Sequence, residues 1–371
     1  MEDCNMLITD QHITYDELQH NSFQLCDDRY GLAAYVLTKS RRNVMLSCPN
    51  ISSPHDGVIY LRMVNGVIAA RTTKFGTLLK VNSEIYPTAT GSALEVHEKY
   101  RNLALGVEFF AGRKIDTDYD YKYTLAAGIS DMALPLYRVM KYHILGFPRL
   151  MQLRNARCIL ESIGLKGRYL RFSLKFVNSL VCFLNKWTAF IVKKKLNDFV
   201  IRQETVIPEW VERIILEDGH KYAEVHNCKW LQWNLDYNFR GLDEDIQSFY
   251  SVFKNGEPIA FFMTKERFRK EAGGKLHNIS IGSIVEWGTK DTSVIDETML
   301  YDLAIPTFST KVDIVEVATT DKVTMKKLKR RVFFSRGFAH VAFKDRTKKF
   351  KDASDINLWR LRLGYADVIL T

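Results

Sequence analysis

The chain has 371 residues, of which 46% are hydrophobic, and its formal net charge is +10. This length exceeds that of a typical single domain, so we expect two domains with a hydrophobic core each. The sequence contains no run of about 18 consecutive apolar residues, which excludes a clearly recognisable membrane-spanning helix. The positive charge favours acidic partners, such as phosphate groups, membrane surfaces or nucleic acid, and does not distinguish among them.

The amino terminus and the cysteines are typical of a cytoplasmic protein. Residues 1–5 include two acidic side chains, whereas a secretory signal begins with a basic segment. The six cysteines are scattered and form no Cys-x-x-Cys pair, which favours reduced thiols over a disulfide framework or a zinc site. The nine histidines show no metal-ligand spacing either. We therefore expect neither disulfides nor a bound metal.

Residues 58–70 have the pattern of a β-hairpin. Two apolar runs with a period of two, residues 58–64 and 67–70, flank Asn65-Gly66, a pair that favours a two-residue hairpin turn. More segments of strand-like composition follow along the first half. They comprise residues 78–81, 92–96 and 123–129, and a helix is predicted over residues 132–144, directly before Gly146-Phe147.

Residues 97–106 have the layout of a phosphate-binding turn between a strand and a helix. The first turn of a helix carries unpaired N–H groups and the positive end of the helix dipole, both of which attract anions. Ala104 and Gly106 are small enough to let a phosphate approach that backbone closely. Arg101 adds a permanent positive charge and several hydrogen-bond donors at the entrance.

This turn resembles the acyl-CoA-binding motif of the GNAT (GCN5-related) N-acetyltransferases, a strand followed by Val-x-x-x-Tyr-Arg-x-x-Gly-x-Gly. Val96, Tyr100, Arg101 and Gly106 match the motif, and Ala104 replaces its first glycine. The resemblance implies that acetyl-CoA, or another acyl-CoA, is the co-substrate. It assigns the pyrophosphate to Arg101 and the following backbone, and the pantetheine arm to the edge of the preceding strand. The implied binding residues are Leu94, Val96, Arg101, Asn102, Leu103, Ala104, Leu105, Gly106 and Val107.

The same resemblance implies the catalytic groups. In the family an acceptor amine attacks the CoA thioester directly, and a tyrosine can protonate the departing thiolate. Tyr142, which begins a match to the family motif Tyr-x-x-x-Gly-Phe, is the expected acid. The base stays open: Glu95 adjoins the donor site, Glu286 occupies the corresponding strand of the second half, and His97 is a rival. Each of the three is also compatible with a solvated surface residue, and Tyr142 with a core tyrosine.

Landmarks of the first half recur in the second. Asn65-Gly66 returns as Asn255-Gly256 after 190 positions, and Gly146-Phe147 returns as Gly337-Phe338 after 191 positions. Together with the resemblance, this repeat predicts an α/β (α+β) fold with two GNAT-like domains in tandem. Each domain is expected to hold a mixed, mainly antiparallel twisted sheet flanked by helices. The predicted limits are residues 1–160 for the acyl-CoA-binding domain, 161–207 for a basic connector and 208–371 for a degenerate second domain.

The second half lacks the phosphate-binding turn. After a strand-like segment that ends at Trp287, the chain reads Gly-Thr-Lys-Asp-Thr-Ser, and Asp291 would repel a phosphate. A helix is predicted over residues 325–336, before the second Gly-Phe pair. The resemblance to tandem-GNAT enzymes implies that such a copy helps to shape the acceptor site. Residues 227–233 also resemble a tract of GNAT-like proteins associated with bacterial surface polysaccharide synthesis, although Asn234 stands where that tract often has Arg. The expected acceptor is a small-molecule or sugar amine.

Residues 166–195 form a basic and apolar segment that has two interpretations. The segment carries eight Lys and Arg residues and no acidic residue. In the first interpretation it is an amphipathic helix at an anionic membrane surface. In the second it is a helix packed between two domains, with its lysines in water. Asn178, Asn185 and Lys186 interrupt the apolar run, so any membrane contact is expected to be peripheral rather than spanning.

Three functions are compatible with these observations. The first is an acyl-CoA-dependent N-acyltransferase, and the co-substrate is then acetyl-CoA or another acyl-CoA. The second is a non-catalytic GNAT-like binding or scaffold protein. The third is a Fem-type aminoacyltransferase that uses aminoacyl-tRNA. Arg101 and the turn of small residues suit a CoA pyrophosphate better than tRNA, so we expect the first function and no nucleic-acid partner. The expected location is cytoplasmic, at the inner face of the membrane if the segment 166–195 binds lipid.

Overall fold

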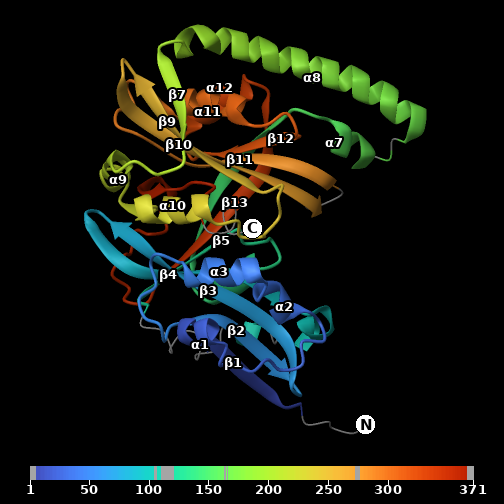
Figure 1. Cartoon of the computed structure of the whole chain (residues 1–371), viewed down its shortest axis with the longest axis vertical. Helices are drawn as coiled ribbons and strands as arrows, with labels where there is room; N and C mark the ends of the chain where they lie inside the picture. Colours follow the sequence, from blue (N-terminus) through green and yellow to red (C-terminus); the bar gives the residue numbers. More distant parts are fainter. Residues whose placement is uncertain are drawn as a thin grey trace.

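The structure is a computed structural model that describes residues 6–103, 107–109, 121–162, 164, 166–271 and 276–365. In these ranges the strands form one continuous mixed sheet (Figure 1). Its order is β1-β2-β3-β4-β5-β13-β6-β12-β11-β10-β9-β7, and β8 pairs with β3 and β14. The strands are β1 (Ile8–Thr14), β2 (Gly57–Val64), β3 (Val67–Val81), β4 (Glu84–Val96), β5 (Tyr123–Ala127), β6 (His143–Leu153), β7 (Phe199–Glu204), β8 (Tyr222–Glu224), β9 (Ile246–Lys254), β10 (Glu257–Glu271), β11 (His277–Thr289), β12 (Ile314–Ala318), β13 (Phe333–Asp345) and β14 (Trp359–Arg360).

Helices cover this sheet at both ends (Figure 1). Their first turns are capped by side chains where the sequence provides them. Thr14 and Glu17 form a capping box at α1, for example, and Asp296 accepts a hydrogen bond from the Met299 N–H at α11. The α-helices are α1 (Tyr15–His20), α2 (Leu32–Val36), α3 (Lys39–Leu46), α6 (Leu134–Val139), α7 (Arg157–Ser162), α8 (Gly167–Leu196), α9 (Trp210–Leu216), α10 (Cys228–Asp236), α11 (Glu297–Ala304) and α12 (Lys322–Lys329). The 3-10 helices are η1 (Glu98–Leu103), η2 (Ile305–Thr307) and η3 (Ile356–Leu358).

Two hairpins begin the matching parts of the sheet, as the Asn-Gly pairs predict. Asn65-Gly66 joins β2 to β3, and Asn255-Gly256 joins β9 to β10. All four residues have positive φ, from 51° at Asn65 to 83° at Gly256, which is the backbone that a tight two-residue turn requires. Each hairpin is followed by a parallel pair of strands, β4 with β5 in the first half and β11 with β12 in the second.

The two halves exchange strands at the centre of the sheet. β6 lies between β12 and β13, and β13 lies between β5 and β6, so each half pairs with a strand of the other. The apolar cores are shared as well. The Trp233 ring packs 6.2 Å from Phe75, and its N–H donates to the Val44 carbonyl at 3.2 Å. The predicted α/β fold, with a mixed and mainly antiparallel sheet flanked by helices, is confirmed, and the strands of the two halves join in one continuous sheet. The domain limits stay a prediction.

The two helices predicted before the Gly-Phe pairs are shorter than expected, and their expected ends are wrong. α6 ends at Val139 and α12 at Lys329, after which Lys141 and Val332 adopt left-handed backbone with φ of 59° and 64°. The chain then enters β6 and β13, which pair with each other so that Gly146 faces His340. Leu145, Phe147 and Phe343 alternate into the core, and this period of two explains the strands.

α8 is the longest helix of the described ranges, with 30 residues. It runs along the outside of the second half, at the top of Figure 1. Neither α8 nor any other helix in the described part of the chain combines the length and the apolar content that crossing a bilayer requires.

Candidate active site

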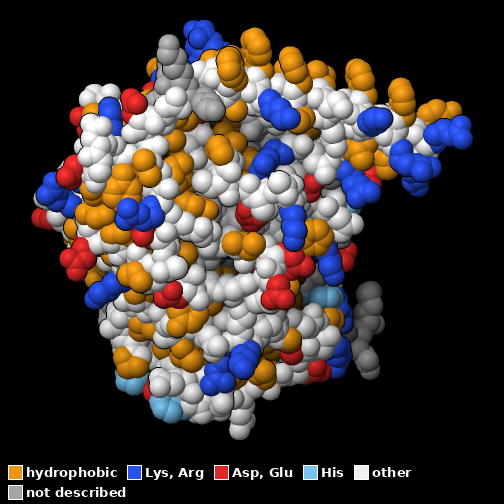
Figure 2. Space-filling model, turned by 45° about the horizontal axis from the view of Figure 1, so that its top comes forward, with side chains coloured by type: hydrophobic (Ala, Val, Ile, Leu, Met, Phe, Trp, Pro, Cys, Tyr) orange, Lys and Arg blue, Asp and Glu red, His pale blue; other side chains and the backbone are white. Residues whose placement is uncertain are grey.

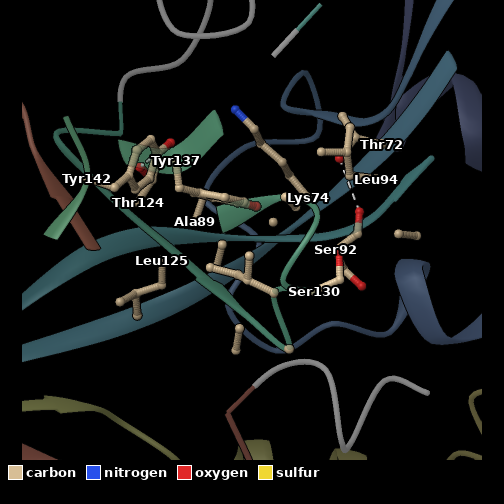
Figure 3. Close-up of a pocket in the computed structure, with 17 residues that line it drawn as sticks. Thr72, Lys74, Ala89, Ser92, Leu94, Thr124, Leu125, Ser130, Tyr137 and Tyr142 are labelled. Atoms are coloured by element: carbon tan, nitrogen blue, oxygen red, sulfur yellow. Dashed lines mark hydrogen bonds between the residues drawn. The ribbon is translucent and has the colours of Figure 1, made fainter. Parts of the chain in front are cut away.

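A cleft opens where β4 and β5 separate. The two strands pair from Ala89–Thr124 to Gly91–Ala126, and among the described residues their ladder ends there. A pocket of about 250 Å³ lies at this point, which we call the β4–β5 cleft (Figure 3). Its lining comes from β3, β4, β5, α6 and the turns around them: Thr72, Lys74, Ala89, Gly91, Ser92, Ala93, Leu94, Thr124, Leu125, Ala126, Ala127, Gly128, Ile129, Ser130, Ala133, Tyr137 and Tyr142.

A β-bulge on β4 forms one wall of the cleft. The register between β3 and β4 shifts after Arg71, and Ala93 has a φ of 54°, which is unusual for a residue with a side chain. The hydroxyls of Thr72 and Thr73 each donate to the Ser92 carbonyl at 3.1 Å. These two bonds hold the bulge, which interrupts the ladder and turns the backbone around Leu94 toward the cleft. Bulges of this kind often re-aim groups beside active sites.

Tyr142 lies on the opposite side of the cleft. Its half-buried ring packs edge-on against Tyr137 at 5.1 Å, and its hydroxyl accepts a hydrogen bond from the Thr124 hydroxyl at 3.4 Å. The ammonium of Lys344 lies 5.3 Å from the same ring. Figure 3 shows Tyr137, Tyr142 and Thr124 together at one end of the cleft, facing the Leu94 end. The predicted acid therefore lies in the cleft and keeps a polar neighbour.

The structure describes most of the predicted donor-binding residues. Leu94 lines the cleft, and Val96 ends β4, where its carbonyl accepts a hydrogen bond from Arg101 Nε at 3.0 Å. Arg101 is exposed on η1, which also contains Asn102 and Leu103. Val107 begins a helical segment at residues 107–109 and is exposed. The remaining predicted residues, Ala104, Leu105 and Gly106, lie outside the described part of the chain.

Glu95 and His97 have other partners. Glu95 forms an ion pair with Arg71 and lines a neighbouring pocket of about 390 Å³, because it points to the other side of β4 than the cleft. The guanidinium of Arg71 also lies 4.3 Å from the Tyr35 ring. His97 stacks on Tyr30 with the ring centres 3.5 Å apart. Neither candidate base is among the residues that line the β4–β5 cleft.

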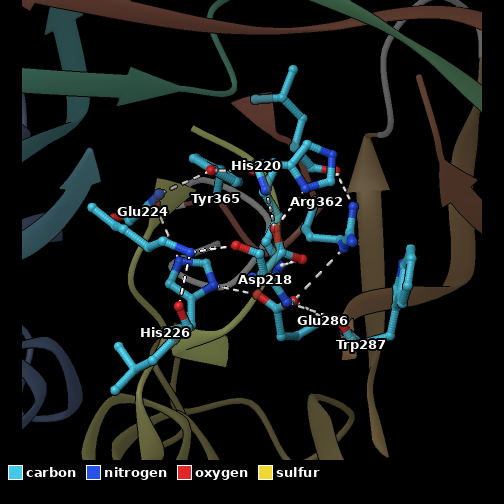
Figure 4. A network of polar contacts seen from close by, with 12 residues as sticks. Asp218, His220, Glu224, His226, Glu286, Trp287, Arg362 and Tyr365 are labelled. Carbon is cyan, nitrogen blue, oxygen red and sulfur yellow. Dashed lines mark hydrogen bonds and ion pairs between the residues drawn. The ribbon is translucent and has the colours of Figure 1, made fainter. Parts of the chain in front are cut away.

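Glu286 lies in a buried polar cluster between the two halves, which we call the Glu286 network (Figure 4). Its carboxylate accepts a hydrogen bond from Arg360 Nη2 at 2.7 Å and pairs with His226 Nδ1. On its other side His226 Nε2 is 3.2 Å from Glu224, and its ring stacks on Trp230 at 3.7 Å. The network consists of Asp218, His220, Glu224, His226, Glu286, Arg360, Arg362 and Tyr365.

The pKa values of Glu286 and His226 are shifted by the opposite charges around them. Burial alone would raise the pKa of Glu286, but Arg360 and His226 outweigh it and lower that pKa to about 2. Burial alone would lower the pKa of His226, but its hydrogen bonds to Glu224 and Glu286 raise it above the usual value. The ion pairs of the network are therefore formed over the neutral pH range, which indicates a structural role for Glu286.

The same shifts predict a dependence of stability on pH. The contribution of Glu286 is fully present above the ordinary carboxyl pKa of 4.5 and is lost as the pH falls toward about 2. The contribution of His226 is fully present below its ordinary pKa of 6.5 and is lost as the pH rises through its raised value. Urea unfolding from acid to mildly alkaline pH measures both limbs. In His226→Gln the alkaline decline should become shallower than in the wild type, and an unchanged decline would contradict this assignment.

In the second half, residues 359–365 lie at the position that corresponds to the β4–β5 cleft of the first half. β11 and β12 pair as far as Ser283–Glu316, and residues 359–365 run alongside β11 beyond that point. The Gly364 N–H donates to the Val285 carbonyl at 2.6 Å, and Arg360 Nη2 donates to the Trp287 carbonyl at 2.8 Å. The Arg362 guanidinium lies 3.6 Å from the Trp287 ring. The chain itself therefore fills this part of the second half.

No family model matches the sequence, and no curated protein does. Solved structures match the fold across most of the chain. N-myristoyltransferase from Saccharomyces cerevisiae, with bound myristoyl-CoA, has a TM-score of 0.57 and 13% identity, covering 93% of this chain and 80% of that one. A GCN5-related N-acetyltransferase from Anabaena variabilis has a TM-score of 0.53 and 10% identity, covering 91% and 73%. A probable N-acyltransferase from Enterococcus faecalis has a TM-score of 0.53 and 12% identity, covering 93% and 74%. The fold of this chain is that of the GNAT acyltransferases, as its two sequence motifs predict.

Proposed function

We propose that the protein is an acyl-CoA-dependent N-acyltransferase, which transfers an acyl group from CoA to an amine. The observation that supports this most directly is the β4–β5 cleft, which has a bulged strand on one side and Tyr142 on the other, with Arg101 bonded to the end of that strand outside the cleft. Solved proteins with this fold include an N-acetyltransferase and an N-myristoyltransferase holding myristoyl-CoA. In this proposal residues 1–160 bind the donor, residues 161–207 connect, and residues 208–371 complete the acceptor site.

The donor is proposed to lie along β4. Arg101 and the backbone of residues 102–107 would hold the pyrophosphate, because a guanidinium and a helix start both favour phosphate oxygens. The pantetheine arm would pair with the edge of β4 from Leu94 to Val96, like an added strand. A Val96 N–H would then lie near the thioester oxygen and stabilise its developing charge. Lys74 also lines the cleft and adds a positive charge to it.

Tyr142 is the proposed general acid. The amine attacks the thioester carbon, the tetrahedral intermediate collapses, and the C–S bond breaks to release the CoA thiolate. A phenol, with a pKa of about 10, is a weaker acid than a thiol, with a pKa of about 8.5, but the gap is small enough for a phenol held close to the sulfur to protonate the thiolate as it leaves. The phenolate then takes a proton from water. Glu95, the neighbour of Leu94, would receive the amine proton only through an intervening water, since its carboxylate is paired with Arg71. Glu286 is fully buried and ion-paired, so we give it no part in the transfer.

The size of the cleft favours a short acyl chain. A volume of about 250 Å³ suits the thioester end of CoA with an acetyl group better than it suits a long fatty chain. The acceptor is proposed to be a small-molecule or sugar amine that binds between the two halves. The C-terminal segment beside β11 supports this division, because it fills the part of the second half that corresponds to the donor cleft.

Thermal unfolding in the presence of acetyl-CoA, myristoyl-CoA or free CoA tests the proposal. A ligand at about 100 times its dissociation constant should add roughly 2.7 kcal/mol to the free energy of unfolding. We expect stabilisation by acetyl-CoA and a smaller effect of myristoyl-CoA. No stabilisation by any acyl-CoA would favour a non-catalytic protein or an aminoacyl-tRNA-dependent transferase instead.

Arg101→Glu is expected to weaken acyl-CoA binding by at least about 100-fold, because a charge-assisted hydrogen bond is replaced by repulsion. Lys99→Glu is the matched control, since Lys99 is exposed on the same 3-10 helix and the charge change is identical. Calorimetric titration with acetyl-CoA measures both. Equal losses in the two variants would show that only the general positive field matters, and unchanged affinity in Arg101→Glu would place the pyrophosphate elsewhere.

A further inference from the structure

α8 carries an exposed apolar stripe from residue 169 to residue 191. Eight large apolar side chains, 49–79% exposed, recur every three or four residues and therefore lie on one face of the helix. Figure 2 shows them as a row along the outer edge of α8, with Lys and Arg beside them. We call this row the α8 stripe: Tyr169, Phe172, Phe176, Leu180, Phe183, Trp187, Phe190 and Ile191.

Polar bonds fix this outward orientation. Asn178 accepts a hydrogen bond from the Ala156 N–H at 2.8 Å and donates to the Asn155 side chain at 3.1 Å. Asn185 donates to the Leu153 carbonyl at 3.0 Å. At 3.6 residues per turn, both asparagines lie about 180° around the helix from the stripe. The helix thus turns amides toward the body of the protein and aromatic rings toward the outside, the reverse of an ordinary surface helix.

The body of the protein supports only one side of α8. In the described ranges the helix contacts α7 and α11 on its inner face, and a cavity of about 870 Å³ separates its C-terminal half from η2. The stripe faces away from these elements, and within the part of the second half that the structure describes no segment covers it. A helix packed between two domains would bury such a row, so the structure favours the interpretation that it meets an external surface.

Positive charge flanks the stripe. Arg168, Arg171, Lys175 and Lys186 are exposed and lie on one flank at helical spacing, and residues 166–195 contain no acidic residue. A shallow, open hollow of about 740 Å³ along this flank is formed by α8 alone, and its lining includes three of these basic side chains and Phe183. Apolar rings next to several cations are complementary to the acyl chains and phosphate groups of an anionic lipid surface.

We propose that α8 binds in the plane of a membrane surface rich in anionic phospholipids, with the α8 stripe among the acyl chains. Tyr169 and Trp187 are of the aromatic types that favour the interface between water and lipid. A second copy of the chain suits the stripe less well, because two facing stripes would bring two basic flanks together. This inference is independent of the proposed transferase activity.

Flotation with vesicles of phosphatidylcholine, with or without about 30% phosphatidylglycerol, tests the proposal. The full chain should float with the anionic vesicles at low salt and bind less at high salt. Phe172→Asp with Phe183→Asp should lower partitioning by at least about 100-fold, because two large rings no longer leave water. Phe338→Asp is the matched control, since Phe338 is also an exposed phenylalanine, 61% exposed on β13, and it should bind as the wild type does.

Two further measurements use the charge and the tryptophan. Replacing Arg171, Lys175 and Lys186 together by Gln should weaken binding to anionic vesicles by about 5-fold for each charge and leave binding to neutral vesicles unchanged. In the wild type, brominated lipids should quench Trp187, which is 56% exposed on α8, whereas Trp210 is half-buried on α9 and Trp230, Trp233, Trp287 and Trp359 are buried. The quenched signal should disappear in Trp187→Phe. This readout does not depend on the folding of the charged variants.

Several results would overturn the proposal. One is a wild-type chain that does not float with anionic vesicles at low salt, or whose Trp187 is not quenched. A second is equal binding by the stripe variant and the wild type. A third is a wild-type dimer in sedimentation that the stripe substitutions dissociate, because the stripe would then be covered by a second copy. Binding that withstands both high salt and a carbonate wash would indicate insertion rather than peripheral contact.

Discussion

Tyr142→Phe is expected to lower turnover by roughly 10²–10⁴ while acyl-CoA affinity stays the same, because the variant keeps the ring and removes only the proton donor. The structure makes this a clean substitution. The ring rests against Tyr137, and its hydroxyl accepts a hydrogen bond of 3.4 Å from Thr124. The loss should therefore appear in the rate and not in the fold. Calorimetry with acetyl-CoA and the rate of CoA release with an amine substrate measure the two quantities separately.

Tyr137→Phe is the matched control. Tyr137 lines the same cleft, is buried, and lies in contact with Tyr142, so the change removes a neighbouring hydroxyl from the same environment. We expect its turnover to remain within a few-fold of the wild type. A large loss in Tyr137→Phe with full activity in Tyr142→Phe would transfer the role of acid to Tyr137. Full activity in both variants would leave protonation of the thiolate to water.

Local signals in the sequence were sufficient for much of this site. Asn65-Gly66 and Asn255-Gly256 each predict a hairpin, because few pairs adopt two positive φ angles so easily. The strand-like residues 92–96 predict the end of β4. The family motif that begins at Tyr142 predicts a tyrosine close to this strand. These features depend on a few neighbouring residues, which is why a sequence pattern can report them.

Features that depend on distant parts of the chain were not predictable in the same way. The predicted helix over residues 132–144 includes the first two residues of β6, and the rest of β6 was not predicted as a strand, because its neighbours β12 and β13 are contributed by residues far along the chain. The bulge at Ala93 has no local signal, since alanine is a rare choice for positive φ. The sequence also did not predict which face of α8 points outward. It shows an amphipathic helix, but only the hydrogen bonds of Asn178 and Asn185 show which face turns inward.

Glu286 is the clearest case of this limit. From the sequence it is a carboxylate on a strand that corresponds to the donor strand, and so a candidate base. The residues that neutralise it, His226 and Arg360, lie 60 and 74 positions away and meet it only in the folded chain. A charge that is fully buried and paired on two sides is committed to the structure. Its removal should therefore affect stability before it affects chemistry.

Glu286→Gln is expected to reduce the free energy of unfolding by about 3–5 kcal/mol, the cost of leaving a buried charge without its partner. Arg360 would keep Asp218 at 3.3 Å and His226 would keep Glu224 at 3.2 Å, but both would lose the carboxylate between them. Glu297→Gln is the matched control. Glu297 is a half-buried glutamate, but desolvation raises its pKa, and its oxygens accept hydrogen bonds from the hydroxyls of Tyr301 and Thr319.

Glu297→Gln puts a neutral amide in place of a carboxyl group that accepts hydrogen bonds from two hydroxyls, so it should reduce the free energy of unfolding by only about 1 kcal/mol. The two variants should therefore differ clearly in urea unfolding. Turnover, measured where both variants are folded, then separates the two roles of Glu286. A structural role predicts a lowered unfolding midpoint for Glu286→Gln and nearly normal turnover, because the network does not line the β4–β5 cleft. A normal midpoint with turnover reduced by roughly 10²-fold or more would instead make Glu286 the general base, and the acceptor would then have to reach the centre of the molecule.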